Sequence, residues 1–162
     1  MTIRGLHHNA YRCRDSEETR RFYEDFLGLP LAEAFEITET KSGRRTSVLH
    51  SFYRMGDGSF MAFFEAPASP FEFKAQHDFD LHIALEVDAA TLQSMFEKGK
   101  AAGVETRGIA DHGFLHSIYF RDPNGYVIEL TAKTAGHDAA MERAKNDARA
   151  KLDRWQAAKQ TA

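Results

Sequence analysis

Hydrophobic and polar residues follow the same pattern in two places along the chain. The segment LHHNAYRCRDSEETRRFY, which begins at Leu6, aligns with LHIALEVDAATLQSMF, which begins at Leu81. Each segment opens with a short stretch of alternating residues, typical of a strand, and continues with apolar residues at helical spacing. An aspartate stands between the two patterns, Asp15 in the first copy and Asp88 in the second, where it is expected to cap the helix.

Three further strands are expected after each helix, because alternating stretches are separated by turns that contain Gly, Pro and Asn. They are predicted at residues 30–38, 46–54 and 59–66 in the first half and at 104–109, 115–121 and 126–132 in the second. Each half therefore predicts a β-α-β-β-β module. The expected fold class is α+β, with two modules side by side that form a curved mixed sheet.

The modules are expected at about 3–67 and 78–133, within one domain that spans residues 1–135. Residues 136–162 carry no strand pattern and predict a C-terminal helical extension. Its apolar stripe at helical spacing consists of Ala144, Ala148, Leu152 and Trp155. This stripe either packs on the protein's own sheet or contacts a second copy of the chain.

The composition fits one domain that acts on a small molecule. The 162 residues are 43% hydrophobic and 28% charged, and no apolar stretch is long enough to span a membrane. A formal net charge of -3 provides no basic surface for nucleic acid or an anionic membrane. The first residues lack the apolar core of a secretory signal, which favours a cytoplasmic location. Cys13, the only cysteine, rules out an internal disulfide and a cysteine-based metal site.

Strand alternation places one histidine of each copy on the polar face of its first strand. In the second copy Leu85 and Val87 belong to the apolar face that packs against the helices, so His82 points away from them. In the first copy Cys13 lies on the helix-facing side and His8 lies opposite. Two imidazoles at matching positions suit a borderline divalent metal.

A third metal ligand is expected from the last strand, YVIELTA. Glu129 interrupts an otherwise apolar run there, and a buried carboxylate is costly unless it is paired or bound to a metal. Two histidines and one carboxylate form the facial triad of non-haem Fe(II) oxygenases, which leaves positions open for substrate and dioxygen. His8, His82 and Glu129 are therefore predicted to hold a divalent ion, Fe(II) first, with Mn(II), Ni(II) or Zn(II) as alternatives.

The segments HNAYRCRDSEETRRFYEDFLGLPL, LHIALEV and FRDPNGYVIEL resemble the vicinal oxygen chelate superfamily, over about residues 3–132. This superfamily includes glyoxalase I, extradiol ring-cleaving dioxygenases, methylmalonyl-CoA epimerase and antibiotic-resistance proteins. The resemblance implies the paired modules, a small-molecule substrate and a homodimer.

One stretch is similar to the signature of extradiol dioxygenases, with His112, Tyr119, the turn DPNG and Glu129 at that signature's spacing. It departs from the signature at Ala110. The resemblance implies that Tyr119 hydrogen-bonds a catecholate oxygen and that His112 orients the substrate or transfers a proton. A phenol and an imidazole are chemically suited to these roles. His116, in the same hairpin, is an alternative acid or base.

The sequence thus predicts an enzyme of aromatic catabolism, an extradiol-type dioxygenase that cleaves a small catecholic diol with O2. The main alternative is a glyoxalase-like lyase with a fourth carboxylate ligand, for which Glu65 is the candidate. Turn spacing puts Glu65 on the opposite face from the one that Glu129 takes in its own strand, unless a bulge intervenes. A drug-binding protein without catalysis is the second alternative. His50 and His77 are expected at the surface or in loops.

Overall fold

The computed structural model describes residues 3–142 and 144–159, which form the β-α-β-β-β order twice and then two helices. The first repeat contains β1 (His8–Cys13), α1 (Ser16–Arg20) with its π-helical continuation η1 (Arg21–Phe26), β2 (Leu31–Glu39), β3 (Arg45–Arg54) and β4 (Phe60–Glu65). The second contains β5 (His82–Glu86), α2 (Ala89–Ala101), β6 (Thr106–Asp111), β7 (Leu115–Arg121) and β8 (Val127–Lys133). The helices α3 (His137–Met141) and α4 (Ala148–Lys159) follow. The predicted fold class is confirmed.

Both expected helix caps are present. The Asp15 carboxylate accepts a hydrogen bond from the backbone N of Glu18 at 2.8 Å, and the Asp88 carboxylate accepts one from the backbone N of Thr91 at 2.6 Å. Each aspartate thereby satisfies one of the amide groups that have no partner inside a helix. The short polar residue after each first strand therefore sets where its helix begins.

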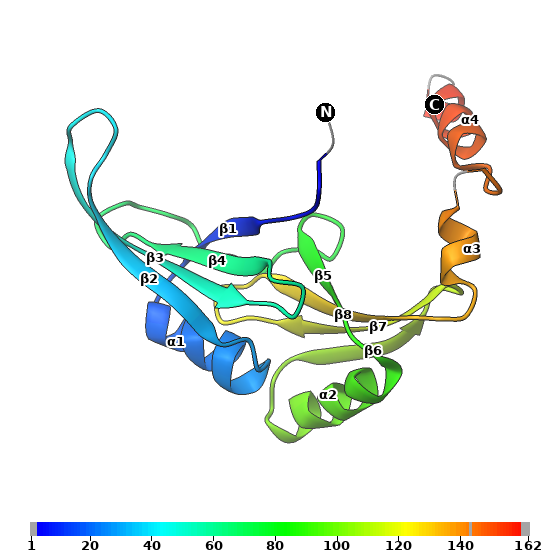
Figure 1. The fold of residues 1–162 in the computed structure, drawn as a ribbon, viewed down its shortest axis with the longest axis horizontal. Coiled ribbons are helices and arrows are strands. Elements are labelled where there is room, and N and C mark those ends of the chain that lie inside the picture. The colour runs from blue at the N-terminus through cyan, green and yellow to red at the C-terminus, as the bar shows by residue number, and fades with distance from the viewer. Residues whose placement is uncertain (1–2, 143, 160–162) are drawn as a thin grey trace. The chain divides into compact units, whose positions relative to one another are not determined.

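The first sheet has the strand order β1-β4-β3-β2, in which β1 and β4 are parallel and the other neighbours are antiparallel. Helix α1 covers one face of this sheet (Figure 1). The core lies between them and includes Tyr23, Tyr53 and Phe63, each no more than 1% exposed. The rings of Tyr23 and Phe63 lie 4.6 Å apart. The helix is therefore fixed to the sheet by buried aromatic packing.

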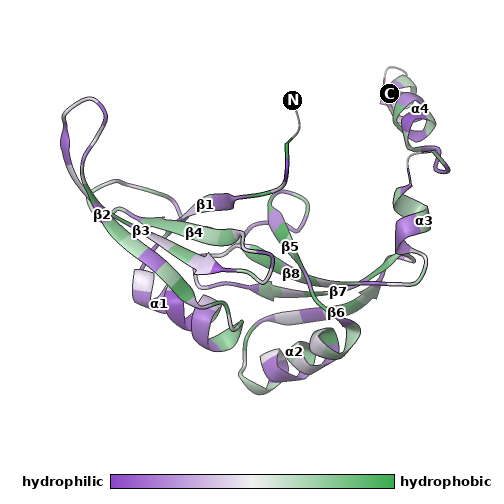
Figure 2. Cartoon of the chain, viewed as in Figure 1, coloured by the Kyte–Doolittle hydropathy of each residue, from purple (hydrophilic) through white to green (hydrophobic). Residues whose placement is uncertain are grey.

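The second sheet has the order β5-β8-β7-β6, with α2 against one face (Figure 1). Strand β8 is the most buried element, with every residue buried except the last. Figure 2 shows β8 as mostly hydrophobic, as it also shows β4 in the first sheet. Helix α2 reaches the sheet through Leu92 and Gly99, both buried. Strand β4 in the first module and strand β8 in the second thus contribute much of the apolar core of their modules.

The chain divides into two compact units, the first reaching to His82 and including the turn Arg121–Val127, the second formed by Ile83–Phe120 and the chain from Ile128 on. The turn belongs to the first unit because its buried polar groups bond there. The Tyr23 hydroxyl donates to the Asp122 carboxylate at 3.0 Å. Burial raises the pKa of the Asp122 carboxyl above its ordinary value, and the hydrogen bonds that it accepts offset only part of this rise.

The C-terminal helix α4 buries none of its residues. Leu152 and Trp155 remain 50% and 66% exposed. The described part of the chain thus leaves the apolar stripe of this helix uncovered. None of the described helices is long and apolar enough to cross a membrane.

Candidate metal and substrate site

His8 is the first residue of β1, as the alternation predicts, and it points away from the helix-facing side on which Cys13 is buried. Its ring centroid lies 5.3 Å from that of Phe52 and 6.1 Å from that of His50. The Nδ1 atoms of His7 and His8 are 2.8 Å apart. When Nδ1 of His8 is the donor in this bond, Nε2 carries the lone pair that a metal requires.

His50 lies inside a strand on the same side of the first sheet as His8, so its assignment to the surface or a loop is wrong. It lies within β3, is 6% exposed, and its Nδ1 is 2.9 Å from the carbonyl oxygen of Phe63. Burial lowers the pKa of this imidazole. Its ring stacks on Phe64 at 3.7 Å. Strand alternation within 46–54, which puts His50 and Phe52 on one face, was the signal that could have found it.

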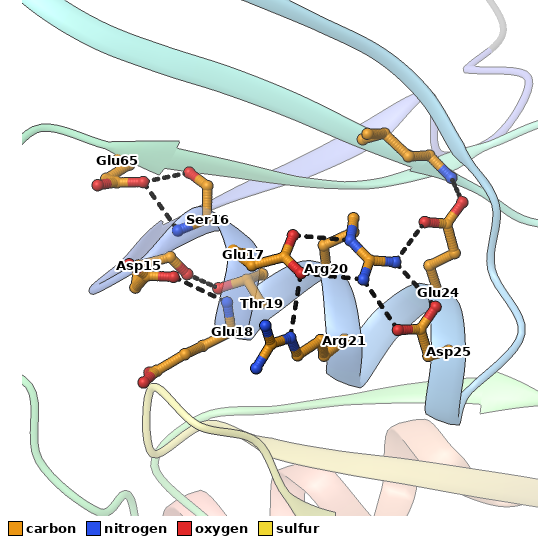
Figure 3. A network of polar contacts seen from close by, with 11 residues as sticks. Asp15, Ser16, Glu17, Glu18, Thr19, Arg20, Arg21, Glu24, Asp25 and Glu65 are labelled. Carbon is orange, nitrogen blue, oxygen red and sulfur yellow. Dashed lines mark hydrogen bonds and ion pairs between the residues drawn. The ribbon is translucent and has the colours of Figure 1, made fainter.

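Glu65, the candidate fourth ligand, caps helix α1. Its Oε2 accepts a hydrogen bond from the backbone N of Ser16 at 2.8 Å and a second from the Ser16 hydroxyl (Figure 3). In the strand register Glu65 pairs with Cys13, which faces the helix. The carboxylate therefore lies on the face predicted from the turn spacing, away from the side of His8.

The side chains of β4 that share the face of His8 carry no metal-binding group. His8 pairs directly with Phe60 in the parallel register, and Ala62 and Phe64 follow at the next positions on that face. Two phenylalanines and an alanine cannot coordinate a metal. Strand β4 therefore adds no fourth ligand beside His8.

His82 is the first residue of β5, as predicted. Its Nδ1 is 2.5 Å from the carbonyl oxygen of Asp78. A carbonyl can only accept, so Nδ1 carries the proton and Nε2 carries the lone pair. Histidines that bind metals commonly donate their second ring nitrogen in this way, which fixes the tautomer and the ring orientation.

Glu129 is the third residue of β8 and is 7% exposed. The hydroxyl of Ser117 donates to the hydroxyl of Thr131 at 3.1 Å, so these two residues face the same way across the β7–β8 hairpin. Two steps along each antiparallel strand from this pair lead to Tyr119 and Glu129. These residues therefore stand opposite each other on the same face of the second sheet.

Tyr119 and His112 are brought together. The Tyr119 hydroxyl and Nε2 of His112 are 2.9 Å apart. The guanidinium of Arg107, which pairs with Tyr119 across β6 and β7, lies 5.8 Å from the centre of the Tyr119 ring. The hairpin thus presents a hydrogen-bonded phenol and imidazole on the Glu129 face.

His116 does not join this pair. It shares strand parity with Phe120, whose ring would meet a Cβ atom added at Gly99 of α2 at 2.5 Å, so both belong to the helix-facing side. Its Nε2 lies 3.5 Å from the Asp111 carboxylate. Of the two histidines considered as the acid or base, His112 is the one hydrogen-bonded to Tyr119 across the 2.9 Å contact.

The donor chemistry of the predicted ligands fits a divalent ion, with two imidazoles whose Nε2 atoms can coordinate and one buried carboxylate. Within residues 3–142 and 144–159, no group of three or more His, Cys, Asp or Glu side chains is close enough together to hold a metal. His8, His82 and Glu129 therefore remain predicted ligands.

The chain contains two β-α-β-β-β modules, and the first strand of each begins with a histidine. The last strand of the second module carries a buried glutamate. These features together define a class of proteins built from a repeated module. The sequence-family model of the Glyoxalase/Bleomycin resistance protein/Dioxygenase superfamily matches residues 5–130. The chain therefore belongs to this superfamily. The resemblance read from the sequence is confirmed at this level.

Two curated relatives are lactoylglutathione lyases of Neisseria meningitidis, from serogroups A and B. Each is 30% identical to this chain over 145 residues, which cover 83% of the chain and 94% of the relative. The likeness to extradiol dioxygenases therefore rests on the signature between His112 and Glu129, which these relatives do not test.

Solved structures share the fold at lower identity. A glyoxylase/bleomycin resistance protein/dioxygenase domain from Frankia sp. EAN1pec has a TM-score of 0.66 at 18% identity and covers 82% of this chain and all of its own. The fosfomycin resistance protein FosX from Mesorhizobium loti has a TM-score of 0.62 at 24% identity, over 86% and 99% of the two chains. A mutant of FosX from Listeria monocytogenes, solved with Mn(II) and 1S,2S-dihydroxypropylphosphonic acid, has a TM-score of 0.60 at 21% identity, over 85% and 98%.

Proposed function

We propose that the protein is a metal-dependent dioxygenase that cleaves a catecholic diol with O2, with His8, His82 and Glu129 as the metal ligands. The observation that carries this proposal is the hydrogen bond of 2.9 Å between the Tyr119 hydroxyl and Nε2 of His112. This pair stands on the face of the second sheet that also carries Glu129.

The ligand set supports iron or manganese. Two histidines and one carboxylate leave coordination positions open, and a diol and dioxygen can occupy them when Fe(II) is bound. The contact of His82 with the Asp78 carbonyl holds one of these ligands in the required tautomer. The absence of a ligand on β4 beside His8 is consistent with three protein ligands.

Tyr119 and His112 supply the proton transfer that ring opening needs. The phenol hydroxyl, fixed by the imidazole, can hydrogen-bond a diol oxygen as its proton leaves. The imidazole can hold that proton and return it to the ring-opened product. Because the two groups are already bonded to each other, the orientation of the phenol is set before the substrate arrives.

A lyase is the second candidate, favoured by the 30% identity to the lactoylglutathione lyases. A divalent ion held by the same three residues would polarise a carbonyl, while a carboxylate moves the proton. The engagement of Glu65 with Ser16 counts against a fourth ligand from β4. A lyase here would therefore work with three protein ligands or draw the fourth from another element.

The test is the metal content of anaerobically purified protein, followed by oxygen uptake with a panel of catechols. We expect about one iron or manganese per chain and oxygen consumption, both lost in His8→Ala, His82→Ala and Glu129→Ala. His137→Ala and Glu65→Gln are matched controls that change a histidine and a glutamate elsewhere and should retain the metal.

Two other outcomes contradict the dioxygenase. Nickel or zinc with turnover of a hemithioacetal and no oxygen uptake would establish the lyase. Tight ligand binding without metal or turnover would identify a binding protein.

A further inference from the structure

Helix α4 exposes a face on which apolar and basic side chains lie together. Leu152 and Trp155, three residues apart on this face, remain 50% and 66% exposed. Lys151 and Lys159 stand four residues before and after Trp155, so they lie next to it on the helix surface. None of the residues of α4 is buried within the described part of the chain. The chain therefore leaves this mixed apolar and basic face uncovered.

Charge is unevenly distributed along the chain. Residues 143–162 contain six Lys and Arg against two Asp, a formal charge of +4. Residues 1–142 contain 15 Lys and Arg against 22 Asp and Glu, a formal charge of -7. The partner that complements α4 is therefore acidic. An anionic membrane or a nucleic acid would attract the C-terminal segment but repel the acidic remainder of the protein, whereas a second copy of the chain brings an acidic surface itself.

The turn before β5, residues 77–80, carries a matching surface. It is closed by a hydrogen bond of 2.9 Å from the backbone N of Asp80 to the carbonyl oxygen of His77. Phe79 is 91% exposed in this turn, and it stands between Asp78 and Asp80 in the sequence. An exposed ring between two carboxylates is complementary, in shape and in charge, to an exposed ring between two lysines.

We propose that α4 of one copy docks on the 77–80 turn of a second copy, with Trp155 against Phe79 and the lysines beside Trp155 facing the aspartates. Each copy carries both surfaces, so two copies can make the contact reciprocally and close as a dimer. Aromatic side chains are typical anchors of such interfaces. The inference is independent of the proposed reaction, because neither surface includes a predicted metal ligand.

Trp155 is the only tryptophan in the chain, so its fluorescence reports on this contact. The experiment follows sedimentation velocity and tryptophan emission of the full-length protein over a range of protein concentrations. We expect a monomer–dimer equilibrium in which the emission moves to shorter wavelength as the dimer forms, because the indole ring leaves water. Added NaCl should favour the monomer, since salt screens the attraction between the lysines and the aspartates.

Two variants, each with a matched control, test the two surfaces. Leu152→Asp and Phe79→Ser should each raise the dissociation constant of the dimer about tenfold or more, the effect of losing one apolar anchor. Ala157→Asp introduces the same charge on the opposite side of α4, two residues after Trp155. Phe71→Ser removes another ring, 47% exposed, that precedes the turn. Both controls should dimerise as the wild type does.

Three results overturn the inference. A wild type that stays monomeric, with emission that does not depend on its concentration, shows that α4 is free or packs on its own chain. A dimer that is indifferent to Leu152→Asp or to Phe79→Ser uses another surface. An emission shift that occurs only when vesicles containing phosphatidylserine are added makes an anionic membrane the partner of α4.

Discussion

Tyr119 and His112 are joined by a hydrogen bond, and residues that act as one unit respond to mutation in a non-additive way. We predict that Tyr119→Phe and His112→Asn each lower kcat by about 10²-fold or more, the usual contribution of a positioned acid or base. The double variant should be little worse than either single one. Stopped-flow or steady-state kinetics on the metal-loaded enzyme measures this, and fully additive losses would show that the two side chains act separately.

The Glu65 carboxylate accepts a hydrogen bond from the backbone N of Ser16 at the start of α1, so Glu65 helps to cap this helix. We predict that Glu65→Ala lowers the free energy of unfolding by about 1–2 kcal/mol, as the loss of a cap does, and leaves the metal content unchanged. Glu129→Ala should instead lose the metal, because Glu129 is a proposed metal ligand. Thermal unfolding and elemental analysis of the two variants separate these roles, and loss of metal in Glu65→Ala would make Glu65 a ligand.

Helix α1 and its continuation η1 carry an ion-pair network on the exposed side, centred on Arg20 (Figure 3). Hydrogen bonds from Arg20 and Arg21 lower the pKa of Glu17 to about 2 from its ordinary value of 4.5. A carboxyl with a depressed pKa in the folded state stabilises the protein above its unfolded pKa and loses this effect as pH falls.

We therefore predict that the stability advantage of the wild type over Glu17→Gln shrinks as pH falls from 4.5 towards 2. Because the network is exposed, the advantage is modest and should shrink further in about 1 M salt at neutral pH. Urea unfolding at several pH values measures it. A difference between the two proteins that stays constant with pH would mean that Glu17 is not paired in solution.

Helix α2 approaches its sheet at Gly99. A Cβ atom there would collide with Oγ1 of Thr106 and lie 2.5 Å from the Phe120 ring. Gly→Ala usually stabilises a helix interior, so the sign of the effect is informative. We predict that Gly99→Ala destabilises the protein by about 1–3 kcal/mol through overpacking. Ser94→Ala, at an exposed position of the same helix, should change stability by no more than about 0.5 kcal/mol, as chemical denaturation can measure.

On the scale of the whole molecule, the DPNG turn of the second repeat is held by buried polar groups of the first unit. The Asn124 side chain, 3% exposed, accepts from the backbone N of Arg14 at 2.8 Å and donates to Thr19 and Asp122 at 3.3 and 3.1 Å. We predict that Asn124→Ala costs about 2–3 kcal/mol, because it leaves buried partners unsatisfied. Ser42→Ala in an exposed turn is the control, and an equal Tm for both variants would contradict the prediction.

The sequence by itself determined the repeated module and the start of its two capped helices. Hydrophobic alternation fixes which face of a strand is buried, and a capping aspartate fixes where a helix begins, since both depend on near neighbours in the chain. His8 and His82 therefore open their strands as predicted. The face of β4 on which Glu65 lies was predicted correctly for the same reason.

Only the tertiary structure decided which residues from distant segments meet. The stack of His50 on Phe64 depends on the register between two strands, and the contact of Tyr119 with His112 depends on the path of a loop. The capping of Ser16 by Glu65 joins residues far apart in the chain. Periodicity records the burial of each position but not its partner, because pairing is selected by the packing of whole elements.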